Sequence, residues 1–403
     1  MRVSISVERR QLTMKQTMHI VILTAGYGNG HIQVARTLEQ SLIRSGVRSV
    51  SVIDLYREAH PGMNSVSRQI YLYSPWFSAF GLDYYGWSYY ATRDLQKTSA
   101  LAKWSNQLGM KKLITLLQKR RADAIISTFP FGGITDQLQK HGIRVPVFTV
   151  VTDFSLHNRW LYTRPDRYYV ATADLKREMI DRGVPAEAIV VSGIPVREPF
   201  YEPARSASPG NPQTQTQPQA TRPSERSRSV LVMMGAHIPL PDVQLITAKL
   251  LALPDVRVDL VCGGNDKLLR RLERRFADHE RLRLFGYVEA IHDRMREAAC
   301  IVTKAGGITL SEAIQIRTPI VVYKPFSGQE RENARYLERK GAAAVASSPR
   351  ALAEQVHELL DSEVRKARML QQYDELAAGC ATETIVQDVL RLSGRIQARA
   401  DSQ

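Results

Sequence analysis

A glycine-rich segment that ends in a histidine is the first place in this sequence where residue types and spacing point to chemistry. Residues 24–31 read TAGYGNGH and lie between a predicted strand, 19–23, and a predicted helix, 32–45. Glycines let backbone N–H groups and a helix N-terminus approach a polar or anionic ligand closely. The helix dipole disfavours a charged histidine in the first turn, so His31 could stay neutral and act as a general base. The alternative is that His31 only caps the turn.

A second glycine motif, residues 303–313 (TKAGGITLSEA), follows a predicted strand in the second half of the chain. Gly306 and Gly307 are expected to bend the chain, with Thr309 opening a helix and Glu312 completing a capping box. The dipole of that helix would face a ligand above the strand ends, and a diphosphate suits this place. Glu312 could instead accept hydrogen bonds from ribose hydroxyls. Lys304 could add positive charge, or it could lie outside the cleft.

Polar side chains also crowd residues 325–333 (PFSGQEREN), directly after another predicted strand. A loop at the carboxyl end of a parallel strand is expected to meet substrate. The chain contains no D-x-D sequence, so nothing suggests an acidic pair that holds a divalent metal. We therefore predict no metal and no cofactor, and expect a helix dipole and backbone amides to stabilise a departing diphosphate.

The elements that would position these motifs are short β-branched runs that alternate with amphipathic helical stretches. This pattern is typical of parallel α/β units and predicts two doubly wound, Rossmann-like domains with ligands in the cleft between them. The predicted strands are 19–23, 49–54, 124–127, 147–152, 167–171 and 189–191 in the first half, and 229–233, 257–262, 282–285, 300–303, 319–323 and 344–345 in the second.

The length of 403 residues exceeds what one compact core holds, since single cores stop growing near about 250–300 residues. Six prolines among Gln, Ser, Thr and Arg make residues 199–228 a predicted disordered linker. The predicted organisation is an N-terminal extension at 1–18, a first domain at 19–198, the linker, a second domain at 229–393 and a tail at 394–403.

The composition, 44% apolar and 24% charged, is that of a globular protein, and no apolar run approaches the roughly 20 residues that span a bilayer. The N-terminus lacks the apolar core of a signal peptide, and three cysteines form no disulfide framework. These features predict a cytoplasmic protein.

The positive charge is uneven, because residues 1–198 carry +11 of the net +15. Such a field attracts polyanions, either nucleic acid or an anionic membrane face, although it could also serve solubility alone. Ten aromatic residues between 71 and 90 precede a run of Lys and Arg, a combination that suits the headgroup level of a membrane. The candidate membrane residues are Trp76, Phe77, Trp87, Lys111, Lys112, Arg120 and Arg121. The alternatives are that several rings belong to the core, or that the surface binds single-stranded nucleic acid, which no accompanying motif supports.

Five ordered motifs together resemble the diacylglycerol glycosyltransferases, which include bacterial processive diacylglycerol glucosyltransferases and plant monogalactosyldiacylglycerol synthases. The motifs are GNGH at 28–31, VTDFSLHNRW at 151–160, GIP at 193–195, the segment 304–313 and GQEREN at 328–333. The resemblance implies a GT-B fold, a UDP-sugar on the C-terminal domain, a lipid acceptor on the N-terminal one and inversion at the anomeric carbon.

The resemblance also implies roles for individual residues. His31 would be the general base, with Asp153 and His157 orienting the acceptor or the base. Gly28, Asn29 and Trp160 would lie on the acceptor side. On the donor side, Gly306 and Gly307 would lie against the diphosphate and Glu312 on the ribose. The remaining donor-side candidates are Gly235, Val288, Lys304, Thr309, Gln329, Glu330 and Asn333.

The leading hypothesis is a hexosyltransferase, bound peripherally to the inner face of the cell membrane, that moves glucose from UDP-glucose to diacylglycerol, with processive addition of further sugars left open. Expected partners are a UDP-sugar, diacylglycerol or its glycosylated form, and anionic lipids, with no nucleic acid. The alternatives are UDP-galactose as donor, N-acetylglucosaminyl transfer to a polyprenyl-linked precursor, a soluble UDP-sugar epimerase, and a non-enzymatic sensor.

Overall fold

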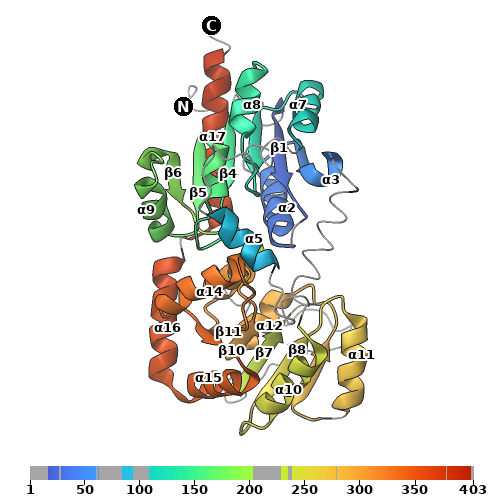
Figure 1. The fold of residues 1–403 in the computed structure, drawn as a ribbon. Helices are drawn as coiled ribbons and strands as arrows, with labels where there is room; N and C mark the ends of the chain where they lie inside the picture. Colours follow the sequence, from blue (N-terminus) through green and yellow to red (C-terminus); the bar gives the residue numbers. More distant parts are fainter. Residues whose placement is uncertain are drawn as a thin grey trace, which may run out of the picture. The chain divides into compact units, whose positions relative to one another are not determined.

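The computed structural model describes residues 17–26, 29–59, 62, 84–93, 109–202, 228–234, 238–277, 279–377 and 379–400. It divides the chain into two compact units. Unit 1 comprises Met1–Arg197 together with Ala378–Gln403, and unit 2 comprises Glu198–Ala377. Each unit is built on its own parallel sheet (Figure 1).

The described part of unit 1 alternates strands and helices along the chain. Its elements are β1 (His19–Thr24), α2 (Asn29–Arg44), β2 (Ser49–Asp54), α3 (Leu55–Ala59), α5 (Tyr84–Arg93), α7 (Met110–Lys119), β3 (Ala124–Ser127), α8 (Ile134–Lys140), β4 (Val147–Val150), η1 (Asn158–Thr163), β5 (Arg167–Val170), α9 (Ala173–Asp181), η2 (Ala186–Ala188), β6 (Ile189–Val191) and α17 (Ala381–Ala400). The strands are parallel and lie in the order β2-β1-β3-β4-β5-β6.

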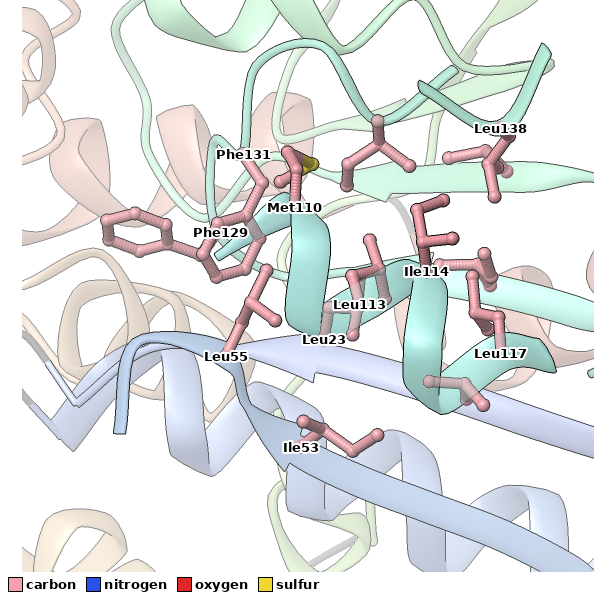
Figure 2. Packing of buried hydrophobic residues seen from close by; sticks show 14 of the residues in the cluster. Leu23, Ile53, Leu55, Met110, Leu113, Ile114, Leu117, Phe129, Phe131 and Leu138 are labelled. Atoms are coloured by element: carbon pink, nitrogen blue, oxygen red, sulfur yellow. The ribbon is translucent and has the colours of Figure 1, made fainter. Parts of the chain in front are cut away.

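One face of this sheet packs on a hydrophobic cluster that α7 and α8 cover (Figure 2). Alternate side chains of β1, Val21 and Leu23, point into the cluster, because successive residues of a strand face opposite sides. α7 contributes one apolar stripe, which comprises Met110, Leu113, Ile114 and Leu117. The opposite face of α7 leaves Lys111 and Lys112 exposed. The helix is therefore held by its apolar stripe and presents its lysines to solvent.

Unit 2 repeats the arrangement. Its elements in the described residues are η3 (Glu198–Phe200), β7 (Ser229–Met233), α10 (Leu240–Leu251), β8 (Arg257–Val261), α11 (Asp266–Arg275), β9 (Leu282–Phe285), α12 (Ile291–Glu297), β10 (Cys300–Thr303), α13 (Gly307–Gln315), β11 (Ile320–Tyr323), α14 (Gln329–Arg339), β12 (Ala344–Ala346), α15 (Pro349–Asp361) and α16 (Glu363–Leu376). The strands are again parallel, in the order β12-β11-β10-β7-β8-β9. The predicted class, two doubly wound domains, is confirmed, and each predicted strand is present within two residues of its expected ends.

The boundaries of the units differ from the prediction at the C-terminal end. Residues 378–393 were assigned to the second domain, but α17 belongs to unit 1. Its Thr382 hydroxyl donates to the carbonyl oxygen of Val196 over 3.0 Å, and the Tyr169 hydroxyl donates to Asp388 over 3.0 Å. Local helical periodicity does not reveal which sheet a helix packs on, and these contacts decide it.

The predicted linker also begins later in the chain than the expected residue, 199. Pro199 and Glu202 offer their carbonyl oxygens to the guanidinium of Arg296 in α12, and the Phe200 ring contacts His292. Residues 199–202 therefore pack on unit 2. Residues 203–227, and the extension at 1–16, lie outside the described residues. Within the described part of the chain, no helix is long and apolar enough to cross a membrane.

Candidate active site

The two glycine motifs occupy equivalent places in the two sheets. In unit 1 the chain order reverses between β1 and β3, and in unit 2 it reverses between β7 and β10. His31 follows β1, and Gly306 follows β10. Ligands of open parallel sheets bind outside the carboxyl ends of the strands at such reversals. Each unit therefore has its predicted ligand motif where the topology favours binding.

The His31 side chain lies at the carboxyl ends of the unit 1 strands, where it is buried. The residue lies in the first turn of α2 and is 8% exposed. Its Nδ1 lies 2.8 Å from the carbonyl oxygen of Thr128 and 3.0 Å from the Oγ1 of Thr152. Thr128 and Thr152 follow β3 and β4, so neighbouring strands deliver both partners.

Burial lowers the pKa of His31 from 6.5 to about 4, and the hydrogen bond to the Thr128 carbonyl offsets only part of this. The ring is therefore neutral near pH 7. Two aromatic rings enclose it: Phe129 meets it edge to face with centroids 5.1 Å apart, and Trp160 lies at 6.3 Å. A neutral imidazole in such surroundings has the protonation state that a general base requires.

The hydrogen-bond partners of the His31 Nδ1 are Thr128 and Thr152, and not the predicted residues Asp153 and His157. Asp153 is 5% exposed and directly follows Thr152. His157 caps η1, because its Nδ1 accepts from the backbone N–H of Arg159 over 3.2 Å. Its Nε2 lies 3.4 Å from the Oγ1 of Thr92 in α5. His157 thus joins η1 to α5, and its predicted orienting role stays a prediction.

Burial lowers the pKa of His157 from 6.5 to about 3, with the positive charge of Arg159 as the next cause. The ring of Tyr89, also in α5, meets the His157 ring edge to face at 4.8 Å. The imidazole is neutral at physiological pH and is enclosed by the contact between α5 and η1.

The candidates for the acceptor and membrane side lie in different settings. Trp87 in α5 is 69% exposed, as expected of a membrane contact. Lys111, Lys112, Arg120 and Arg121 are exposed as well. Trp160 is only 2% exposed and its ring lies near that of His31, so its predicted place on the acceptor side stays a prediction. Gly28, Trp76 and Phe77 lie outside the described residues, and of Asn29 only the backbone, which begins α2, is described.

In unit 2 the second glycine motif forms the start of α13. The helix begins at Gly307 with Gly306 as N-cap, and no side chain caps it. The predicted capping box of Thr309 and Glu312 is therefore wrong, because Gly306 in an extended conformation is the N-cap and the helix begins at Gly307, two residues before Thr309. A Cβ built on Gly306 would meet no atom within 4 Å, so the space above this helix N-terminus is open. An anion can approach these backbone N–H groups closely.

Glu312 lies one turn further along α13 and is 5% exposed. Because the helix begins at Gly307, its carboxylate does not cap the first turn. The alternative role predicted for Glu312, a contact to ribose hydroxyls, stays a prediction.

Lys304 and Glu330 both contact Phe326. The Lys304 Nζ lies 3.6 Å from the ring centroid, and the backbone N–H of Phe326 donates to the Glu330 carboxylate over 3.3 Å. Burial lowers the pKa of Lys304 to about 8, with the charge of Glu330 acting against that shift. Burial raises the pKa of Glu330, while the Lys304 charge lowers it. The structure therefore brings two predicted donor-side residues together, and Phe326 joins them without having been predicted.

The start of α14 supplies the other predicted donor-side residues. Gln329 is its first residue, after Gly328 at φ 85° and ψ −135°, a conformation that favours glycine. Asn333 is fully buried, and its side-chain amide donates to the Ala305 carbonyl over 3.2 Å. Val288 is partly exposed after β9, and Gly235 lies outside the described residues.

Sequence reasoning missed Thr128 and Thr152 as partners of the base. A signal did exist, since Thr128 directly follows the predicted strand 124–127 and Thr152 is the last residue of the predicted strand 147–152, and both strands were predicted to be part of the same domain. The order of those strands, however, was needed to bring them to His31.

The fold places the chain in a structural class of proteins. The chain is similar to solved structures of a glycosyltransferase of kitacinnamycin (15% identity, TM-score 0.59, 93% of this chain and 98% of that one) and of Acinetobacter baumannii MurG (17%, 0.57, 93% and 99%). It is also similar to a UDP-N-acetylglucosamine 2-epimerase (15%, 0.54, 94% and 96%). These likenesses show a GT-B fold of two Rossmann-like domains, which transferases and epimerases share.

The family follows from sequence. The family model of monogalactosyldiacylglycerol synthase matches residues 31–196, and that of the glycosyltransferase family 28 C-terminal domain matches residues 241–388. Relatives named processive diacylglycerol beta-glucosyltransferase include those of Bacillus cytotoxicus, 38% identical over 87% of both chains, and of Bacillus mycoides, 37% identical over 91% of this chain and 93% of that one. The chain belongs to the diacylglycerol glycosyltransferases, as its motifs predicted.

Proposed function

We propose that this protein is a processive diacylglycerol β-glucosyltransferase that transfers glucose from UDP-glucose to diacylglycerol. The observation that carries the proposal is a neutral, buried His31 at the chain reversal of unit 1, in a chain 38% identical to enzymes with that name. The product still carries sugar hydroxyls, so it can serve as the acceptor of a further round.

In the proposed reaction the free hydroxyl of diacylglycerol attacks the anomeric carbon of the donor. The Nε2 of His31 takes the hydroxyl proton as the new C–O bond forms, and the bond between the anomeric carbon and the diphosphate breaks. Attack from the face opposite the leaving group inverts the anomeric centre, so an α-linked donor gives a β-glucoside. UDP leaves with the bonding electron pair.

The donor-side residues of unit 2 are assigned to the leaving group and the sugar. Backbone N–H groups at Gly306 and Gly307, with the α13 dipole, stabilise the negative charge that develops on the diphosphate. The Lys304 ammonium adds positive charge. Glu312 binds the ribose, while Gln329 and Glu330 bind sugar hydroxyls. No metal or cofactor takes part in this assignment.

The acceptor is a membrane lipid, and we assign membrane docking to unit 1. Exposed Trp87 on α5 and exposed Lys111 and Lys112 on α7 are residue types that bind headgroups and anionic lipid, respectively. The protein would thus work peripherally at the inner face of the cell membrane, with anionic lipids as partners and without nucleic acid.

One observation favours a second candidate, a UDP-galactose donor, because the family model that matches residues 31–196 is that of monogalactosyldiacylglycerol synthase. Glucose and galactose differ at one hydroxyl, and the matched residues lie in unit 1, whereas the donor-side residues lie in unit 2. The relatives named for glucose transfer cover both units, so glucose remains the first choice.

The test is a UDP-release assay with UDP-glucose and with UDP-galactose, each with and without diacylglycerol in anionic mixed micelles. We expect diacylglycerol-dependent release from UDP-glucose, with a β-glucoside as product. His31→Ala should lower kcat by about 10²–10⁴ while UDP affinity is kept. Release from neither donor, by protein that binds UDP, would contradict the proposed function. Unchanged turnover of His31→Ala would contradict the assignment of the base.

A further inference from the structure

Three adjacent strands bring two threonines to the His31 ring. β1, β3 and β4 are neighbours in the sheet, and they are followed by the segment that carries His31, by Thr128 and by Thr152. Thr128 is 0% and Thr152 is 3% exposed. The contacts to His31 are thus shielded from water, where hydrogen-bond geometry matters most because a lost partner is not replaced by solvent.

The backbone carbonyl of Thr128 determines which ring nitrogen of His31 carries the proton. A carbonyl oxygen only accepts hydrogen bonds, so the His31 Nδ1, 2.8 Å away, must be the donor. The lone pair of the neutral ring is then on Nε2. The Thr152 Oγ1, 3.0 Å from the same Nδ1, must accept from that N–H as well.

Thr128 also fixes the helix that carries the base. Its hydroxyl lies 3.1 Å from the carbonyl oxygen of His31 and 3.3 Å from that of Leu23 in β1. The start of α2 is therefore bound to the same residue that orients the ring. The Thr128 carbonyl belongs to the backbone and cannot be removed by substitution, whereas the Thr152 hydroxyl can.

We propose that Thr152 is a positioning residue, whose hydroxyl acts with the Thr128 carbonyl to hold His31 in the Nδ1–H tautomer and so to present Nε2 to the acceptor hydroxyl. The catalytic consequence rests on the proposed function, whereas the tautomer does not. Neutral partners orient the imidazole without the strong rise in pKa that a carboxylate would cause. This assigns to Thr152 the orienting role that the sequence had offered to Asp153.

The first experiment reads the tautomer directly. The protein is labelled with ¹⁵N-histidine, and the ring signals of His31 are assigned by their loss in His31→Gln. We expect the Nδ1–H form in the wild type at pH 7. Thr152→Val keeps the Thr128 carbonyl and should keep this tautomer, but its His31 ring should be more mobile, with broadened ring signals, because one of the two acceptors of the Nδ1–H is lost. An Nε2–H ring in the wild type would overturn the proposal whatever the enzyme's activity.

The second experiment separates positioning from stability by kinetics. Thr152→Val should lower kcat about two- to tenfold, as expected for one lost neutral hydrogen bond, with an unchanged KM for UDP-glucose, and Thr152→Ser should restore kcat. Thr149→Val is the matched control, because Thr149 is a buried threonine of β4 whose hydroxyl bonds Thr163 instead of the base.

The outcomes are distinct. If Thr152→Val keeps wild-type kcat, or if Thr149→Val loses as much, the hydroxyl has only a structural role and the proposal fails. If the wild type lacks diacylglycerol-dependent turnover, the proposed function fails, and the ¹⁵N spectra alone decide, by the mobility of the His31 ring in Thr152→Val, whether Thr152 orients His31.

Discussion

The side chain of Asn333 ties α14 to the glycine motif, since its amide donates to the Ala305 carbonyl over 3.2 Å in a fully buried position. Ala305 directly precedes Gly306, so this bond fixes the loop from which the α13 backbone would meet a diphosphate. Two segments that were assigned separately to the donor are therefore one structural unit.

Asn333→Ala should weaken UDP binding and lower stability together. The buried Ala305 carbonyl would lose a partner, which costs about 1–3 kcal/mol, and the loop would become mobile. The dissociation constant of UDP by calorimetry and the melting temperature are the measurements. Glu338→Ala, an exposed change in the same helix, is the control and should alter neither. A destabilised Asn333→Ala with unchanged UDP affinity would show that the bond serves the fold alone.

UDP affinity should fall as pH rises through about 8. Lys304 has a pKa lowered to about 8, so the free protein carries the charge below that pH and loses it above. A diphosphate binds the charged form better. Titration of UDP at pH 7 and pH 9 should show the loss in the wild type but not in Lys304→Met, which should bind weakly at both. An equal pH dependence in both proteins would place Lys304 outside the donor site.

Acid should destabilise the protein through its buried histidines. His157 has a folded pKa of about 3 against 6.5, so between these values the unfolded chain binds a proton that the folded protein does not. Stability from this group is thus complete above about pH 6.5 and declines as pH falls. The decline is on the order of a few kcal/mol, since one pKa unit corresponds to about 1.4 kcal/mol.

Urea unfolding at pH 7 and pH 5 measures this effect. His157→Gln should be less stable than the wild type at pH 7, because η1 loses its cap, but should lose less stability between the two pH values. His141→Gln, at an exposed histidine, is the control. A pH dependence that is the same in His157→Gln and in the wild type would exclude His157 as its source.

The two basic pairs at the two ends of α7, Lys111 with Lys112 and Arg120 with Arg121, should differ in their effect on membranes. The helix begins beside Leu55, which follows the last residue of β2, since a Cβ on Gly109 would lie 2.9 Å from Leu55. It ends where the Arg120 carbonyl meets the ring of His19, the first residue of β1, at 3.0 Å. Lys111 and Lys112 therefore lie toward the carboxyl edge of the sheet, as His31 does, and Arg120 and Arg121 toward the opposite edge.

A bilayer that supplies lipid to His31 must face the carboxyl edge. Replacing Lys111 and Lys112 by Gln should weaken binding to anionic vesicles by about tenfold or more, in a salt-sensitive manner, since each basic residue near the surface contributes about 1 kcal/mol. The same change at Arg120 and Arg121 should have a smaller effect. Vesicle cosedimentation compares the pairs, and a larger loss from the arginine pair would refute this orientation of the docking surface.

The sequence by itself determined the strands, the class of fold and the position of the two glycine motifs at the carboxyl ends of strands. β-branched runs specify strands locally, and glycines after a strand mark where a backbone can approach a ligand. His31, Lys304, Gly306 and Glu330 were predicted as site residues in this way, because motif and strand end coincide. The five motifs also sufficed to predict the family.

Only the tertiary structure decided which groups meet. The partners of His31 lie 97 and 121 positions away, and they reach it because β1, β3 and β4 are neighbours, an order that no local pattern encodes. The same holds for α17, which packs on unit 1 although the chain has just left unit 2. Which residues meet depends on packing between segments that are distant in the sequence. The same packing buries the histidines and so lowers their pKa values, an effect that the periodicity of a sequence does not report.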